Sequence, residues 1–498
     1  GTGGWTTVSS ITNKNTTSSA VPDDWNYVTQ TFTNLSVAPG QEIWLDWQFK
    51  KEGSTSASMA ALDNVRIYDF ARNDPAIVTQ PIPQSAILSN SVTFSVTAAS
   101  GQALSYQWRK NGSAISGATS ASYTIASALP SDVASYDVVV SAGGNSVTST
   151  AVPLQVYTRM PVKGPVANAS AVTAPAATYS QDATLGDITV VNSASYTNKF
   201  DLYLPDAAVK ANSRPAIVVI HGGGGNDGDK QDTREVQACI EFASHGYVAL
   251  SLNYKKSYKT TSTGNWSTAW PQNIKDAKTA VRWLRKNAAT YGIDTNRIGA
   301  IGFSWGGNEA AMLALTDGDS TLDPASEDGL GTYSTKVACA ANFYGAVQIP
   351  DYHNMNQFSG NGVPGSTGTM DNPTNNYLLA SPASRASSSA APMLLSHGDA
   401  DLEVMPTQNY ALKAALLNAG AKIQGVQMVP GGLHSYYLYD TGSHNTNTNQ
   451  ITDVRASTLG FFDQYLLPYA PAITSSGTVA GAAGSSFTYQ IQANNSPT

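Results

Sequence analysis

The 498-residue chain has little charge and almost no cysteine. Charged residues make up 13% of it and the formal net charge is −7. An acidic balance without a basic stripe argues against nucleic acid as a partner. The two cysteines, Cys239 and Cys339, lack metal-ligand spacing and lie in patterns typical of a helix and a buried strand. We expect both to be free, buried thiols.

The sequence also lacks a long apolar run and a recognisable leader. No stretch approaches the roughly 20 apolar residues that span a bilayer, so we expect a soluble protein without a membrane partner. No signal peptide is visible and the chain opens on Gly1, which suggests a processed or trimmed product. Abundant Ser, Thr, Asn and Gly with few charges favour a secreted or cell-surface bacterial protein, which we expect to be monomeric.

A chain of this length should contain several domains, because single cores stop growing at roughly 250–300 residues. The composition and patterning change along it and indicate five segments. These are a partial, jelly-roll-like β-sandwich (1–72), an Ig-like β-sandwich (75–157), a linker or extended strap (158–180), an α/β catalytic domain (181–470) and the start of a truncated β-sandwich (471–498).

The second segment resembles immunoglobulin-like modules of bacterial secreted proteins. Trp108 stands where that fold buries a tryptophan, and Asp132 with Tyr136 resembles its tyrosine corner. Val138 occupies the position that is usually the second cysteine, so the inter-sheet disulfide is absent. Such a module more often spaces or anchors a partner domain than acts alone.

From about residue 181 the pattern alternates between apolar runs and helical periods, which predicts a mostly parallel sheet with helices on both faces. The predicted strands are AIVVI (216–220), YVALSLN (247–253), RIGAIG (297–302), KVACAANFYGA (336–346), APMLLS (391–396) and IQGVQMV (423–429).

GFSWGG (302–307) follows one of these strands and matches the G-x-S-x-G nucleophile elbow, with Ser304 as the nucleophile. The motif alone is weak, since Gly and Ser fill turns everywhere. A serine hydroxyl also needs a base, an orienting acid and an oxyanion hole at the carboxyl ends of strands.

The order Ser, Asp/Glu, His expected of this fold selects the base and the acid. Among the six histidines, only His434 combines that order with a position at a strand end. Three acids lie in HGDADLEVMP (397–406). We assign Asp401 as the triad acid, with Glu403 a distant second and Asp399 as a turn or capping residue.

HGGGG (221–225) predicts the oxyanion hole, since consecutive glycines let backbone N–H groups approach a developing charge. We expect donors at Gly223 or Gly224 and at Trp305 N–H. A phosphate-binding loop would need the Walker pattern, which is missing.

Residues 199–437 resemble the α/β-hydrolase esterases, particularly the acetylxylan and feruloyl esterase-like group. The matching stretches are DLYLPD (201–206), AIVVIHGGGGNDGDK (216–230), GYVALSLNYK (246–255), IKDAKTAVRWLRKNAATYGIDTNRIGAIGFSWGG (274–307), LLSHGDADLEVMPTQNYALKAALLNAG (394–420) and PGGLHSY (430–436). The resemblance implies a secreted serine esterase of plant cell-wall polysaccharide esters, acetyl or feruloyl, and of small aryl or alkyl esters. It implies Ser304 as nucleophile, Asp401 as acid and His434 as base.

Two alternatives stay open at this point. GFSWGG also approaches the GxSYGG elbow of prolyl oligopeptidase-type peptidases, although no propeller repeat precedes it. The other alternative is a non-catalytic surface protein that binds carbohydrate or mediates adhesion.

We expect no cofactor and no metal, because the histidines and cysteines form no ligand cluster. Trp305 replaces the small residue usual after the nucleophile and is expected to line the acyl pocket. Tyr352 and Phe358, in a long insertion, are candidate substrate contacts, although packing of the insertion onto the body is the favoured explanation. Lys255, Lys256 and Lys259 suggest either an acidic sugar or, more simply, a solvated face.

Overall fold

The computed structural model describes residues 74–165, 179–193, 196–207, 213–259, 266–267, 269–323, 329–349, 375–421, 423–429, 431–436, 454–467, 472–473 and 493–494. The chain divides into two compact units, Gly1–Asp63 and Asn64–Thr498. The sandwich expected at 1–72 lies outside the described residues. Of the domain expected at 471–498, only the antiparallel pair β23 (Ala472–Ile473) and β24 (Ala493–Asn494) is described.

Residues 74–157 are rich in strands. They form β1 (Ala76–Thr79), β2 (Gln84–Ile87), β3 (Val92–Ser95), β4 (Thr97–Ala99), β5 (Ser105–Lys110), β6 (Ser113–Ala114), β7 (Ser122–Ile125), β8 (Ala134–Ala142), β9 (Asn145–Thr148) and β10 (Val152–Tyr157). Their largest sheet has the order β2-β10-β8-β5-β6, with β9 paired to β8. Trp108 is fully buried, and the Tyr136 hydroxyl donates to the Asp132 carbonyl at 2.9 Å. The Ig-like assignment stays a prediction.

The rest of the chain is built around a ten-stranded sheet with the order β12-β11-β14-β16-β15-β19-β20-β21-β22, and β13 pairs with β14. The strands are β11 (Val162–Gly164), β12 (Tyr179–Gln181), β13 (Ile188–Ser193), β14 (Tyr196–Pro205), β15 (Arg214–Ile220), β16 (Val248–Asn253), β19 (Ile293–Phe303), β20 (Cys339–Phe343), β21 (Met393–Gly398) and β22 (Ile423–Val429). Six neighbouring strands of this sheet run parallel, in the order β16-β15-β19-β20-β21-β22, and β14 is antiparallel to β16.

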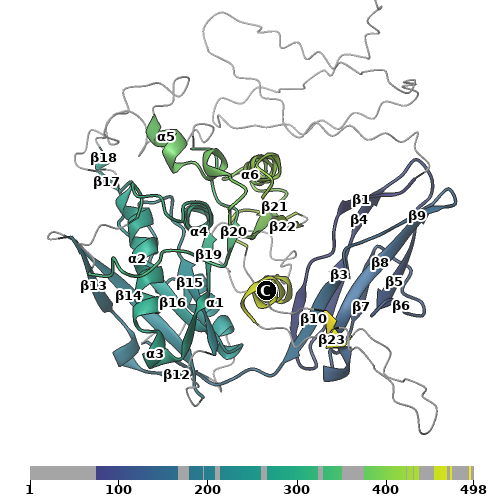
Figure 1. Cartoon of the computed structure of the whole chain (residues 1–498), viewed down its shortest axis with the longest axis horizontal. Helices are drawn as coiled ribbons and strands as arrows, with labels where there is room; N and C mark the ends of the chain where they lie inside the picture. Colours follow the sequence, from purple (N-terminus) through teal and green to yellow (C-terminus); the bar gives the residue numbers. More distant parts are fainter. Residues whose placement is uncertain are drawn as a thin grey trace, which may run out of the picture. The chain divides into compact units, whose positions relative to one another are not determined.

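Helices alternate with these strands, as expected for an α/β domain (Figure 1). They are α1 (Thr233–Ser244), α2 (Gln272–Lys286), α3 (Ala288–Tyr291), α4 (Trp305–Leu315), α5 (Asn375–Ala380), α6 (Thr407–Asn418) and α7 (Arg455–Leu466), and a small hairpin joins β17 (Tyr258–Lys259) to β18 (Trp266–Ser267). Within the described part of the chain, no helix has the length and apolar character to cross a bilayer.

Strand β15 shows why its sequence is apolar without alternation. All seven of its residues are buried, because helices cover both faces of the sheet. Ala216, Val218 and Ile220 belong to a core that includes residues of α2, α4 and α6. Ile217 and Val219 belong to a second core with α1 and α7. The alternation of side chains along one strand therefore divides the domain into two apolar layers.

The segment expected as a linker is strand at both of its described ends. In β11, Val162 pairs with Pro205 and Lys163 with Leu204 of β14, and β12 pairs with β11. Both strands belong to the ten-stranded sheet, so the edge of this sheet begins before residue 181. Each of these strands has only three residues, too few to show a hydrophobic period, which is why the composition alone indicated a connection.

The strand order reverses at β15. The chain goes from β15 to β16 on one side, and then crosses to β19 on the other side. In open parallel sheets such a reversal opens a crevice at the carboxyl ends of the two diverging strands. HGGGG follows the end of β15, and Ser304 follows the end of β19. The expected active site therefore lies at this crevice.

Both cysteines are buried and free, as expected, with Cys239 in α1 and Cys339 in β20. Burial raises the pKa of each thiol well above its ordinary value. Neither is a reactive thiolate at neutral pH.

Candidate active site

Ser304 occupies a sharp turn between β19 and α4. Its φ of 53° and ψ of −119° are unusual for a residue with a side chain and cost on the order of 1–3 kcal/mol. Backbone hydrogen bonds hold the turn. Ser304 N–H donates to the Phe343 carbonyl at 2.9 Å, and Gly307 N–H donates to the Ser304 carbonyl at 2.8 Å. The strained geometry is that of a nucleophile elbow.

The glycines around Ser304 are required by close backbone contacts. A Cβ on Gly302 would overlap the backbone of Gly306, the second residue of α4. A Cβ on Gly306 would overlap the carbonyls of Ile220 and His221 at the end of β15. The G-x-S-x-G spacing thus lets α4 leave β19 directly and lie against the end of β15.

The structure brings Ser304, His434 and Asp401 into one hydrogen-bonded chain. Ser304 Oγ lies 3.0 Å from His434 Nε2, and His434 Nδ1 lies 2.8 Å from Asp401 Oδ2. Asp401 is fully buried and His434 is 6% exposed. Since Nδ1–H faces a carboxylate, Nε2 is the lone-pair nitrogen that accepts the serine proton.

Asp401 is fixed as an anion from two sides. Its Oδ1 accepts the N–H groups of Glu403 and Val404 at 2.9 and 3.0 Å. Burial alone would raise its pKa, but hydrogen bonds from His397 and His434 outweigh burial and lower the pKa of Asp401 to about 2. The carboxylate is therefore ionised at any pH at which the protein would work.

The other two acids of this loop have different positions. Asp399 Oδ1 accepts the N–H of Gly431 at 2.5 Å and so ties the β21 end to the turn before His434. Glu403 is half exposed, and its Oε1 is 3.9 Å from His434 Nε2, on the serine side of the imidazole. Of the three carboxylates, only that of Asp401 faces Nδ1.

His397 is a site residue that the sequence reasoning passed over. It is fully buried at the end of β21, where its Nε2–H donates to the Val404 carbonyl at 2.6 Å and lies 3.2 Å from Asp401 Oδ2. This histidine closes the turn that carries Asp401 and adds a second donor to its carboxylate. The H-G-x-x-D spacing after a strand, from His397 to Asp401, was the signal in the sequence that could have placed this histidine beside the triad acid.

The glycine loop lies beside the nucleophile. A Cβ on Gly222 would stand 3.2 Å from Ser304 Cβ. Gly223 and Gly224 have φ values of +96° and +59°, which the HGGGG run supplies without strain. Donation from Gly223, Gly224 and Trp305 N–H groups to an oxyanion stays a prediction.

The Trp305 side chain is 3% exposed and forms part of the core. A Cβ on Gly225 would stand 3.1 Å from the indole. Burial raises the pKa of the neighbouring Glu309 well above its usual range, partly offset by hydrogen bonds from Asn273 and Trp305. These contacts direct the indole into the domain, and its expected role in lining the acyl pocket stays a prediction.

The candidate substrate contacts Tyr352 and Phe358 lie outside the described residues. His221 is buried against Tyr254, with ring centroids 4.2 Å apart, and burial lowers its pKa to about 4, so it is a neutral structural residue. In the described ranges, no group of three or more His, Cys, Asp or Glu could hold a metal ion.

Residues 200–416 match the model of the BD-FAE family. The match covers somewhat less than half of the chain. It includes the elbow with Ser304 and the loop with Asp401, and it ends before His434.

Two curated relatives share sequence with this domain. The esterase LipQ of Mycobacterium tuberculosis (strain ATCC 25618 / H37Rv) is 31% identical over 248 residues, which are 49% of this chain and 55% of LipQ. The esterase LipC of the same strain is 27% identical over 232 residues, which are 45% of this chain and 54% of LipC. The chain thus spans about half the length of the curated relatives it matches. Over the shared residues the chain is similar to proteins named as esterases.

Among solved structures, a truncated form of a carbohydrate esterase from gut microbiota is similar to this chain. The match covers 51% of this chain and 90% of that one, with 27% identity and a TM-score of 0.39.

Proposed function

We propose that the whole protein is a serine carboxylic ester hydrolase that works through an acyl-enzyme. One observation carries the proposal: the uninterrupted hydrogen-bonded chain from Asp401 through His434 to Ser304 on a strained elbow. A turn built only for folding would have no reason to hold an unfavourable φ at Ser304 and a buried, ionised Asp401 behind an imidazole.

The geometry supports a two-step reaction. Ser304 Oγ attacks the ester carbonyl carbon while His434 Nε2 takes its proton, and the carbonyl oxygen becomes an oxyanion beside the glycine loop. His434 then gives the proton to the alcohol oxygen, the ester C–O bond breaks and the acyl group remains on Ser304. Water repeats the sequence, with His434 again as base and then as acid, and releases the carboxylic acid.

We propose esters of plant cell-wall polysaccharides, acetyl or feruloyl, as the natural substrates, with small aryl and alkyl esters also accepted. The stretches that resemble cell-wall esterases support this, and the strand-rich residues 74–157 suit a spacing or targeting role. Secretion or display at the cell surface follows from such a substrate, which does not enter the cell.

Peptide-bond hydrolysis is the alternative enzymatic function. The reported relatives are named esterases, and this favours an ester over a peptide bond. The assembled triad favours an enzyme over a non-catalytic binding protein.

A small chromogenic ester tests the proposal directly. The full chain should hydrolyse p-nitrophenyl acetate, and Ser304→Ala should abolish turnover while its circular dichroism spectrum stays unchanged. Product analysis on acetylated and feruloylated xylan then identifies the acyl group, with a proline-containing peptide amide as the comparison. Turnover of the amide in preference to every ester would refute the proposal.

A further inference from the structure

The glycine loop beside Ser304 has an internal turn, in which the Gly223 carbonyl accepts the N–H groups of Asn226 and Asp227, but its other carbonyls are held by other segments. Gly223, Gly224, Gly225 and Gly228 all have positive φ, and a glycine run has more backbone freedom than any other sequence. An oxyanion hole needs donors fixed in place before the charge forms. The contacts that hold this loop therefore determine how well it can bind an oxyanion.

Tyr254 holds the first part of the loop. Its hydroxyl lies 3.2 Å from the His221 carbonyl and 3.0 Å from the Gly222 carbonyl, so its single proton is shared between them. The ring also stacks on the His221 imidazole. Tyr254 is 2% exposed, so this contact is shielded from water.

Lys256 and Ser257 hold the second part. Lys256 Nζ donates to the Gly228 carbonyl at 2.7 Å, and Ser257 N–H donates to the Gly225 carbonyl at 2.8 Å. Lys256 thus has a partner inside the protein, where the sequence suggested a solvated face or a contact with an acidic sugar.

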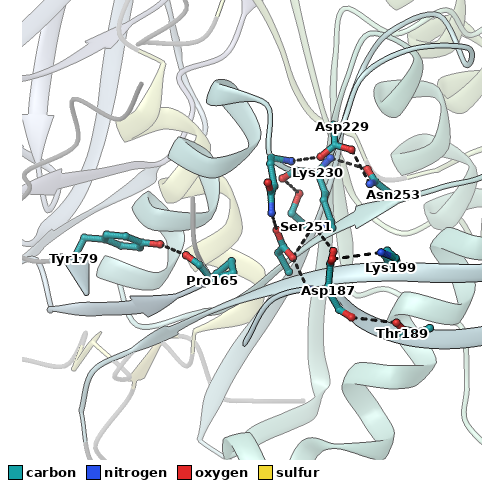
Figure 2. Close-up of polar contacts among 11 residues, drawn as sticks. Pro165, Tyr179, Asp187, Thr189, Lys199, Asp229, Lys230, Ser251 and Asn253 are labelled. Carbon is teal, nitrogen blue, oxygen red and sulfur yellow. Dashed lines mark hydrogen bonds and ion pairs between the residues drawn. The ribbon is translucent and has the colours of Figure 1, made fainter. Parts of the chain in front are cut away.

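The end of the loop is held by the same stretch of chain. Lys230 N–H donates to Asn253 Oδ1 at 2.7 Å, and Ser251 Oγ donates to the Lys230 carbonyl at 2.9 Å. Asn253 Nδ2 also donates to Asp229 Oδ2 at 2.8 Å. Figure 2 shows the contacts that join Ser251 and Asn253 to Lys230.

The Lys230 ammonium fastens this end to the sheet. It is 3% exposed and pairs with the buried Asp201 at 2.8 Å and with the exposed Asp187 at 3.1 Å. Lys199 contacts the far side of the same cluster, 3.3 Å from Asp187 (Figure 2). Among the described residues, Lys199 pairs with Asp187 and not with the glycine loop, which makes it a matched lysine for comparison.

We propose that residues 251–257, which follow from β16, form the scaffold that shapes the glycine loop for an oxyanion, with Tyr254 and Lys256 as positioning residues. This inference rests on the proposed esterase function. The Tyr254 hydroxyl fixes the direction of the His221 and Gly222 carbonyls, and each fixes the N–H on the other side of its peptide plane, that of Gly222 and of Gly223. Lys256 acts further along, where its bond to the Gly228 carbonyl holds the end of the loop in place. Neither residue need touch the substrate.

Full-length Tyr254→Phe and Lys256→Met test the scaffold beside Lys199→Met. Because a misplacement of about 1 Å can cost about 100-fold in rate, we expect each scaffold variant to lower kcat on p-nitrophenyl acetate about 10-fold with KM within about twofold. Affinity for an aryl trifluoromethyl ketone, which forms a tetrahedral oxyanion with Ser304, should fall by the same factor. Lys199→Met should change none of these values, and Lys256→Arg, which keeps a donor, should recover most of the loss.

Two results would overturn the scaffold. One is unchanged ketone affinity in both Tyr254→Phe and Lys256→Met, and the other is an equal loss in Lys199→Met. Melting temperatures measured alongside identify a variant that has merely unfolded, in which case Lys256→Arg carries the comparison. If wild-type turnover is lost in Ser304→Ala, the esterase function stands, and either result then refutes the scaffold alone.

Discussion

Replacing Asp401 by asparagine tests how the triad is held. Oδ1 of Asp401 accepts two backbone N–H groups, so the amide oxygen of asparagine should take that position. The amide NH₂ then faces His434 Nδ1–H and His397 Nε2–H. His397 cannot turn to accept, because its proton is already donated to the Val404 carbonyl at 2.6 Å. Flipping the amide only moves the conflict to the two backbone donors.

His434 can relieve this conflict by moving its proton from Nδ1 to Nε2. It then accepts from the asparagine amide but can no longer take the proton of Ser304, 3.0 Å away. The wrong tautomer costs about 10⁴ in kcat in serine hydrolases with a triad. That factor corresponds to about 5 kcal/mol of transition-state stabilisation. We expect a loss of this size for Asp401→Asn, with KM nearly unchanged.

The assay is steady-state hydrolysis of p-nitrophenyl acetate between pH 5 and 9, where Asp401, with a pKa of about 2, is ionised throughout. Asp399→Asn is the matched control, because the asparagine oxygen can still accept the Gly431 N–H, and its rate should stay within about threefold. A larger loss in Asp399→Asn than in Asp401→Asn, or an Asp401→Asn rate within about 10-fold of wild type, would refute the reasoning.

Three further changes should have measurable results. Gly306→Ala should lower the free energy of unfolding by about 1–3 kcal/mol in urea titrations, since its Cβ overlaps the carbonyls of Ile220 and His221; an unchanged midpoint would contradict this contact. The raised pKa of Glu309 in the folded state means that its contribution to stability falls as pH rises above its unfolded value, so Glu309→Gln should gain melting temperature over wild type at pH 8 but not at pH 4.5, and an equal gain at both would count against the shift. A fragment of residues 181–470 should melt below one of residues 158–470, because it lacks β11 and the Arg159–Glu241 ion pair, yet both should hydrolyse a soluble ester at equal kcat; a lower kcat in a well-folded 181–470 fragment would place part of the site upstream.

Much of the site could be predicted from the sequence because its determinants are local. A G-x-S-x-G turn after an apolar run requires both the strand and the tight approach of α4, and a histidine beyond a later strand end completes the triad order. Runs such as RPAIVVI have no alternation because both sheet faces are covered, so strand positions could be inferred from composition. Ser304 could be identified from its G-x-S-x-G motif, and His434 from being the histidine that combines the triad order with a position at a strand end.

Other properties depend on contacts between distant segments. The sequence favoured Asp401 over Asp399 as the triad acid, but the contacts that separate the two, with His434 Nδ1 and with Gly431 N–H, exist only in the fold. The short strand β11 is stabilised by its pairing with β14, whose residues lie about 40 positions further along the chain. A partner at that distance produces no hydrophobic period in the sequence of β11.

The role of Lys256 was decided in the same way. A lysine in a polar stretch of sequence can lie on a solvated face, contact a substrate or bind another segment of the protein. The sequence around Lys256 does not distinguish these three roles. Its ammonium reaches the Gly228 carbonyl because the ends of β15 and β16 lie side by side in the sheet. Local sequence thus determined which groups can do chemistry, while the tertiary structure decided which groups hold them in place, since hydrogen-bond partners are selected by distance in space and not along the chain.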